Sequence, residues 1–401
     1  MSERPPDIAG YRLSSRSMWI LAILVFAVTR ISNFPLSLDF RVDEVLYFNW
    51  ALLIREGGFP VGDDQYQYPP AAGVLFLGIE LLPGTFHRVF MFSVVLADAA
   101  IFILMLVRVG RFGDSWRGPW IWITAGALVG YFMFERFDVF PALLAVIALL
   151  VLSRPTISGG LMGLGAMIKL WPIFVLFAVR RDQLIRALAG VLVGVFGVIG
   201  IVALTLDNPL SFLSGQSGRG LQLEANVAFP LLIAAQLGLV KVQSVDRYGS
   251  TELDAPYAGG IAWLGIAIAV ALLAMLVIQR LRGKLEMIPG SDVALAALLV
   301  FIAFNRVNSP QFFTWIAAVA SVALLDRRSR MVVPVVLVFA SMLPFAQYIS
   351  HYYWALQVQT TEAVILQVIR SALMIAGAVL AWWFVVNGRA YRDVSSANTR
   401  I

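Results

Sequence analysis

Residues 259–279 read GGIAWLGIAIAVALLAMLVIQ, a run of 21 residues without a charged side chain. A transmembrane α-helix needs about 20 consecutive apolar residues to cross the hydrocarbon core of a bilayer. Comparable runs recur along the chain, so the sequence predicts an all-α polytopic membrane protein. The other runs are 17–31, 88–107, 119–134, 139–153, 187–206, 292–304, 311–325, 331–349 and 363–386.

The composition agrees with this interpretation. Of the 401 residues, 60% are hydrophobic and only 13% are charged, whereas a soluble globular protein has about 25% charged residues. These values exclude a soluble enzyme, a disordered protein and a fibrous repeat. The chain has no Cys and two His, which excludes disulfides and a thiol nucleophile. We therefore expect neither a metal nor another cofactor.

Basic residues form seven clusters between the apolar runs. Because Lys and Arg of membrane proteins gather in cytoplasmic loops, we place all seven clusters on the cytoplasmic side. Both termini are then cytoplasmic, and the polar residues 1–16 form a tail and no cleaved signal. No internal repeat divides the chain, so a single domain over residues 1–401 is expected. The clusters lie at Arg4–Arg16, Arg108–Arg117, Arg154, Arg180–Arg186, Arg280–Lys284, Arg327–Arg330 and Arg389–Arg400.

Three apolar segments are not expected to span the membrane. Residues 69–83 open with Pro69-Pro70 and carry Glu80, which predicts a re-entrant or interfacial helix. Segment 157–179 has basic clusters at both ends and breaks at Lys169-Leu-Trp-Pro172. It is expected to enter the membrane, break and return, with the break lining a cavity. Segment 227–240 is expected to dip from the outer face.

With this orientation the polar segments between the apolar runs fall on the outer side. The first outer loop, 32–68, carries six acids and two bases. Within it Asp43, Tyr47 and Trp50 have the spacing i, i+4, i+7 and share one face of a short helix. A carboxylate and two rings on one face suit a sugar, although an interfacial helix with aromatic belt residues has the same pattern.

Four further segments carry groups suited to a phosphate or to hydroxyls. Lys169 lies in a helix break, where it needs a partner because an unpaired Lys in hydrocarbon costs several kcal/mol. A lipid phosphate or a buried acid would serve. Arg136 and Asp138 end a helix on the outer side and suit either an ion pair or a ligand. The other polar segments are Ser214–Glu224, with Arg219, Gln222 and Glu224, and Asn305–Gln311, with Arg306.

The order of these motifs resembles glycosyltransferase family 87, whose members are GT-C fold membrane enzymes. The first loop matches as Asp43-x-x-x-Tyr47, Gly57-Gly-x-Pro60 and Tyr68-Pro-Pro. The resemblance covers about residues 30–320. The later motifs are Arg136-Phe-Asp138-x-x-Pro141, Gly163-Leu-Gly-Ala-Met-Ile-Lys169-Leu-Trp-Pro172, Arg219-Gly-Leu-Gln-Leu-Glu224 and Ser309-Pro-Gln311-Phe-Phe-x-Trp315.

The resemblance implies a GT-C fold with about 11–13 transmembrane or re-entrant helices and an active site at the outer face. It implies that Asp43 is the catalytic general base, and that Lys169, Arg219 and Arg306 stabilise a lipid-phosphate leaving group. The implied partners are a polyprenyl-phosphate sugar donor, a glycan or glycolipid acceptor and membrane lipid. The predicted substrate-binding residues are Glu44, Tyr47, Tyr68, Arg136, Asp138, Lys169, Arg219, Gln222, Glu224, Arg306 and Gln311.

The resemblance leaves the sugar open. Mannose is the expected sugar, with arabinofuranose as the alternative, because none of the matched motifs contains the His that some family members use. A lipid-linked sugar transporter or flippase is a second class. Transporters of that kind carry paired broken helices in two repeats, and the sequence shows one broken segment. No phosphate-binding loop indicates an ATP motor, and no basic patch with interleaved aromatic residues indicates nucleic acid.

Overall fold

The computed structural model describes residues 15–37, 42–63, 65–213, 218–343, 352–388 and 391. In this part of the chain five helices are long and apolar enough to cross a membrane, and six shorter apolar helices accompany them. The prediction of an all-α polytopic membrane protein is confirmed. The five long helices are α1 (Ser15–Ser37), α4 (Phe86–Phe112), α9 (Leu184–Ala203), α12 (Ala258–Leu281) and α17 (Thr361–Asn387).

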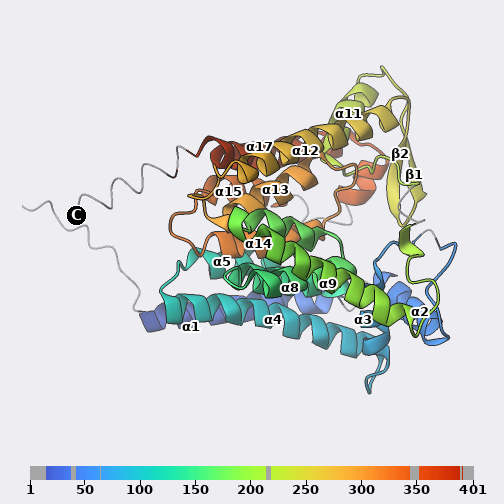
Figure 1. The fold of residues 1–401 in the computed structure, drawn as a ribbon. Coiled ribbons are helices and arrows are strands. Elements are labelled where there is room, and N and C mark those ends of the chain that lie inside the picture. The colour runs from blue at the N-terminus through green and yellow to red at the C-terminus, as the bar shows by residue number, and fades with distance from the viewer. Residues whose placement is uncertain are drawn as a thin grey trace, which may run out of the picture.

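Each predicted apolar run contains a helix. The shorter helices that pack between the long ones are α5 (Arg117–Val129), α6 (Phe132–Glu135), α7 (Val139–Leu150), α8 (Pro155–Ile168), α13 (Gly290–Phe304), α14 (Phe312–Ala323) and α15 (Val332–Ala340). Three more helices lie toward one end of the molecule in Figure 1: α2 (Val42–Arg55), α3 (Pro70–Glu80) and α11 (Phe229–Gln236).

Local signals in the sequence set the ends of the longest helices. The hydroxyl of Thr85 accepts a hydrogen bond from the backbone N–H of Arg88 at the start of α4, and Thr360 does the same for α17. Both helices end at a glycine with positive φ, Gly113 (φ 70°) and Gly388 (φ 60°). A hydroxyl at the N-cap is a usual start signal of an α-helix, and a left-handed glycine after the last turn is a usual stop signal.

Helices α8 and α9 run in the same direction although they are close in sequence. A Cβ at Gly159 would contact the backbone of Ala187, and a Cβ at Gly163 would contact Val191 and Gly194. Higher residue numbers in α8 thus face higher residue numbers in α9, so the two helices are parallel. The chain between them must therefore run back from the end of α8 to the start of α9. It does so through the 3₁₀ helix η1 (Trp171–Ala178). Segment 157–179 therefore reverses its direction after a break at Lys169, the position at which the sequence predicts a break.

Lys169 itself has an extended backbone (φ −157°, ψ 129°) between α8 and η1. Pro172 stands at the start of η1, where its missing N–H breaks no helical hydrogen bond. The side chains at this break therefore reach the interior of the protein from non-helical backbone.

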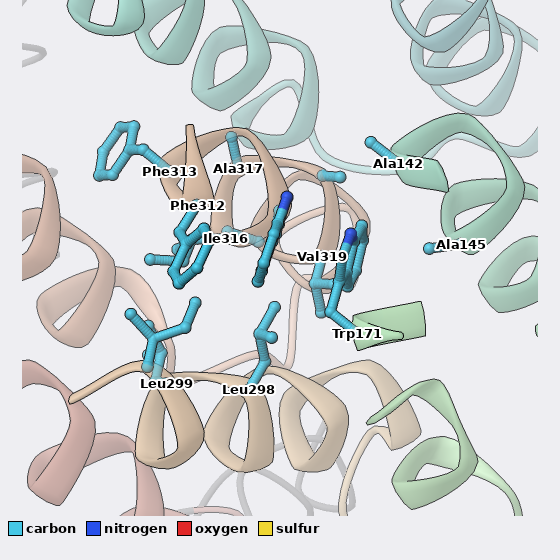
Figure 2. Packing of buried hydrophobic residues seen from close by; sticks show 14 of the residues in the cluster. Ala142, Ala145, Trp171, Leu298, Leu299, Phe312, Phe313, Ile316, Ala317 and Val319 are labelled. Atoms are coloured by element: carbon cyan, nitrogen blue, oxygen red, sulfur yellow. The ribbon is translucent and has the colours of Figure 1, made fainter. Parts of the chain in front are cut away.

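The core lies around α14, which is buried along its whole length. Figure 2 shows Phe312, Ile316 and Val319 of α14 facing Leu298 and Leu299 of α13. The same view places Trp171 of η1 beside Val319. It shows Ala142 on α7, the helix next to them. A helix that is hydrophobic on all sides belongs in the interior, so α14 is the central element around which the broken segment packs.

A two-stranded antiparallel hairpin is the one addition to the predicted helices in the described residues. It consists of β1 (Gln243–Arg247) and β2 (Ser250–Asp254). Its turn residues Tyr248 (φ 53°) and Gly249 (φ 68°) both have positive φ, as a two-residue hairpin turn requires. Leu223 N donates to Thr251 O (3.0 Å), which joins the hairpin to the segment before α11. The sequence predicts a polar outer segment here, and the two strands are an addition to that prediction.

The two ends of the bundle differ. One end, here called the basic end, holds Ser115, whose N–H donates to Leu325 O (2.9 Å), and Arg180, which pairs with Glu286 (3.4 Å). The other end, here called the hairpin end, holds α2, α3, β1 and β2 (Figure 1). The basic clusters at 108–117, 180–186, 280–284 and 327–330 thus lie at the end opposite to the hairpin, as the sequence predicts.

Candidate functional site

A cavity of about 600 Å³ opens at the hairpin end. Its walls come from the loop before α3, the break between α8 and η1, the hairpin turn, and the segments before α11 and before α14. Eight of the twelve predicted site residues, all in the described part of the chain, line this cavity. They are Tyr68, Arg136, Lys169, Arg219, Gln222, Glu224, Arg306 and Gln311.

The cavity is electropositive. Among the described residues that line it, the cations are Arg136, Lys169, Arg219 and Arg306, and the one acid is Glu224. Low-dielectric walls strengthen the field of such charges. An anionic group of a ligand is therefore the chemistry that this cavity favours at its polar end.

The partner that Lys169 requires is Asp138. Lys169 Nζ donates to Asp138 Oδ1 (2.8 Å), and the indole N–H of Trp315 donates to the same oxygen. Lys169 also lies over the rings of Tyr68 (5.4 Å) and Phe137 (4.8 Å). Of the two partners expected from the sequence, the structure contains the buried acid, and Lys169 still reaches the cavity wall.

Arg219 and Arg306 are held by backbone carbonyls. Arg306 Nη1 donates to Arg219 O (2.7 Å), and Arg219 Nη2 donates to Tyr248 O in the hairpin turn (3.1 Å). Gln67 Nε2 donates to the same carbonyl of Tyr248 (3.3 Å). These contacts orient the two guanidinium groups at the cavity wall.

Gln222 joins two of the predicted motifs. Its Oε1 accepts from Asn308 N (2.7 Å), and its Nε2 donates to Ser309 Oγ (3.4 Å) and to Glu224 Oε2 (3.3 Å). The backbone N–H of Gln222 also donates to Arg306 O (3.0 Å). The 219–224 and 305–311 segments, far apart in sequence, therefore form one wall.

Glu224 is almost fully buried in this wall. Burial raises the pKa of Glu224 to about 7, while the positive charges of Arg370 and Arg136 act to lower it. Its Oε1 atom has no hydrogen bond. Glu224 therefore titrates near neutral pH and keeps unused acceptor capacity beside the cavity.

The matched family covers the central part of this site. Residues 66–241 match the sequence profile of glycosyltransferase family 87. This stretch is similar to that family. The searches of the curated proteins and of the solved structures gave no significant match. The family implies a membrane glycosyltransferase, in agreement with the helices and with the resemblance seen in the sequence.

Residues 66–241, here called the family 87 region, include seven of the predicted site residues and leave five outside. Asp43, Glu44 and Tyr47 precede the matched residues, and Arg306 and Gln311 follow them. The cavity nevertheless combines residues of the region with Arg306 and Gln311. The part of the chain after the family 87 region therefore completes the wall of the site.

Four predicted residues are not among those lining the cavity. Asp43 lies in the first turn of α2, and its side chain lies outside the described part of the chain. Glu44 Oε2 contacts His87 Nδ1 on α4 (2.5 Å). Tyr47 is buried and stacks on Phe76, with ring centroids 4.6 Å apart. The fourth is Asp138, which pairs with Lys169 and does not itself line the cavity.

Sequence reasoning missed several cavity residues. Tyr248 and Tyr353 line the cavity but stand in no recognisable motif, and Gln67, which also lines it, stands directly before the Tyr68-Pro-Pro motif. Arg370 did leave a signal, because an ionisable residue inside a long apolar segment marks a functional or paired position. It pairs with Glu224 (3.8 Å). No cluster of three or more metal-ligating side chains occurs among the residues that the structure describes.

Proposed function

We propose that this protein is a GT-C glycosyltransferase that moves a sugar from a polyprenyl-phosphate donor to a hydroxyl of a cell-envelope glycan or glycolipid. Mannose is the proposed sugar, and arabinofuranose is the alternative. The observation that carries the proposal is the electropositive cavity built around the family 87 region. A sugar bound to a lipid phosphate needs both an anion site and polar groups for hydroxyls.

The contents of the cavity support a lipid donor. The cations Arg136, Lys169, Arg219 and Arg306 suit a phosphate, which Arg and Lys bind with charge-assisted hydrogen bonds. Leu170, Ile173, Phe174 and Phe301 line the same cavity and offer apolar contact to an isoprenoid chain. The cavity volume of about 600 Å³ falls within the range of small-molecule sites.

We assign the general base to Asp43, as the family resemblance implies. In this mechanism the carboxylate takes the proton of the acceptor hydroxyl while the hydroxyl oxygen attacks the anomeric carbon. The bond from that carbon to the phosphate oxygen breaks, and the phosphate leaves with the bonding electrons. Direct displacement inverts the anomeric centre. Lys169, Arg219 and Arg306 stabilise the charge that develops on the leaving phosphate.

The proposed location is the plasma membrane, with the basic end and both termini in the cytoplasm. The positive-inside rule supports this orientation. It places the cavity at the outer face, where an envelope acceptor is available. The transporter alternative would need a second broken segment related to α8 and η1, and no observation favours it.

A transfer assay tests the proposal. Purified protein in nanodiscs is incubated with radiolabelled polyprenyl-phosphate mannose or polyprenyl-phosphate arabinofuranose and a membrane lipid extract. Label should move from one donor to a new product, and Asp43→Asn should abolish transfer while the protein stays folded. Glu56→Gln, an exposed acid at the end of α2, is the matched control and should retain transfer.

Each negative result has a definite meaning. Transfer at the wild-type rate in Asp43→Asn would remove the base from Asp43 and make Glu44 the next candidate. Absence of transfer from both donors, with tight binding of one of them, would favour the transporter.

A further inference from the structure

Three arginines are buried in the described long helices: Arg30, Arg280 and Arg370. Arg30 and Arg370 are partnered very differently. Arg30 of α1 donates to both carboxylate oxygens of Asp98 on α4, at 2.9 Å and 3.0 Å. The indole N–H of Trp122 donates to Asp98 as well (2.8 Å). Such a bidentate pair with further hydrogen bonds satisfies both charges, so its role is to join α1, α4 and α5.

Arg370 of α17 pairs more loosely with Glu224. Arg370 Nη1 lies 3.8 Å from Glu224 Oε1, and both side chains are almost fully buried, with 1% and 3% of their surface exposed. Glu224 Oε1 has no hydrogen bond. Because Glu224 also lines the cavity, this pair borders the candidate site. The Arg30–Asp98 pair is instead buried between packed helices.

The segment around Arg370 is braced toward Glu224. Gln367, one turn before Arg370, donates to the backbone carbonyl of Glu224 (3.0 Å) and accepts from Arg370 Nη1 (3.2 Å) and from Tyr352 OH (2.7 Å). Apart from Glu224, the members of this network come from residues after the family 87 region. It holds the charge of Arg370 behind a carboxylate at the cavity wall.

We propose that Glu224 is the carboxylate that binds hydroxyl groups of the transferred sugar, and that Arg370 is a positioning residue that keeps Glu224 ionised and oriented. The inference rests on the proposed function, because it divides one cavity between two parts of the donor. The four cations bind the phosphate, and Glu224 with Gln222 binds the sugar.

This division names the class of sugar. A carboxylate accepts hydrogen bonds from hydroxyls, and buried polar groups of this kind discriminate strongly against ligands that lack the matching donor. A carboxylate on the sugar would meet the like charge of Glu224 in a low-dielectric wall. The donor sugar is therefore a neutral hexose or pentose with free hydroxyls and not a uronic acid.

The charged and titratable groups around Glu224 set the pH range of this role. Arg370 on α17 and Arg136 before α7 favour the ionised carboxylate, and burial opposes them. Tyr352 and Tyr353 are the titratable neighbours on the segment before α17. With the pKa of Glu224 at about 7, the carboxylate gains its charge as the pH rises through neutrality. Loss of the Arg370 charge moves that change to higher pH.

The test compares two lipids that differ only in the sugar. Binding of polyprenyl phosphate and of the polyprenyl-phosphate sugar that the wild type uses is measured in nanodiscs at pH 8. Glu224→Gln should weaken binding of the sugar-bearing lipid by about 10- to 100-fold, the size expected for a hydrogen bond to a charged group. It should leave polyprenyl phosphate binding unchanged. Glu252→Gln is the matched control, because Glu252 accepts from Gly220 N (2.9 Å) outside the cavity lining.

The role of Arg370 is tested by the pH profile of the same binding ratio. Arg370→Gln should shift the midpoint of sugar recognition to higher pH, and Arg370→Lys should restore most of the wild-type midpoint. Merely structural damage would lower both affinities without moving the midpoint.

The outcomes separate the two proposals. If the wild type binds neither lipid, the proposed function fails and the inference falls with it. If it binds both lipids but Glu224→Gln weakens them equally, or the midpoint stays in place in Arg370→Gln, the inference alone is refuted.

Discussion

Replacement of Lys169 by Met tests whether this residue serves the fold, the donor or both. Lys169 Nζ is bound to Asp138 (2.8 Å) and has only 12% of its side chain exposed. Removing one partner of a buried ion pair costs about 3–5 kcal/mol of stability. Lys169→Met alone should therefore lower the stability strongly. The double variant Lys169→Met/Asp138→Asn removes both charges and should recover most of the loss.

The double variant separates donor binding from stability. Two unit charges about 4 Å apart interact by about 4 kcal/mol at an effective dielectric constant of 20. Asp138 compensates part of the lysine charge, so we expect a loss of about 2–3 kcal/mol in binding of a lipid phosphate. That loss corresponds to about a 30- to 150-fold weaker Kd. The acceptor carries no phosphate at this position, so its KM should change much less.

The measurements are thermal unfolding in detergent and polyprenyl phosphate binding in nanodiscs, with the exposed Lys241→Met as the control. A double variant that is stable and binds polyprenyl phosphate as tightly as the wild type would refute the donor role. Lys169 would then be only the partner of Asp138.

Three further predictions concern packing and the hairpin. Gly190→Leu should destabilise the protein by about 3 kcal/mol or more, because a Cβ there would lie 2.1 Å from the backbone of α8. The control Gly197→Leu on the same helix meets open space and should fold normally. Equal unfolding temperatures of the two variants would contradict the parallel packing of α8 and α9. Arg30→Met should cost about 3–5 kcal/mol by leaving Asp98 buried without its cation, yet leave polyprenyl phosphate binding unchanged in the folded fraction, and weakened binding in that fraction would show that this pair also serves the site. Gly249→Val should strain the left-handed turn by about 1–3 kcal/mol and weaken donor binding, because the turn carbonyl that orients Arg219 would move; an unaltered Kd would show that the turn does not support the site.

Much of the architecture was predictable because a membrane helix has a strong sequence signal. The run 259–279 became α12, and the run 88–107 became α4, since only a helix satisfies the backbone of a long apolar segment in lipid. The break at Lys169 was also predictable, because Pro172 and a lysine interrupt an apolar run whose two ends both carry arginines.

The hairpin was not predictable from the same signals. Residues 243–254 show no clear alternation of apolar and polar side chains, and β2 is buried beside residues 221–223 and Tyr353, which are distant in sequence. The partner of Glu44 was hidden for a similar reason. His87 stands in the first turn of α4, and nothing in either local sequence indicates that α2 lies beside it.

The sequence by itself determined the class of the protein, the positions of its apolar helices and the identity of the charged residues in the cavity wall. These depend on local composition and on recognisable motifs. Only the tertiary structure decided which of these residues act together. Asp138 became the partner of Lys169, and Arg370 came to stand behind Glu224. Pairings of this kind depend on how helices far apart in sequence pack, because the attraction between two charges depends on their distance in space and not on their separation along the chain.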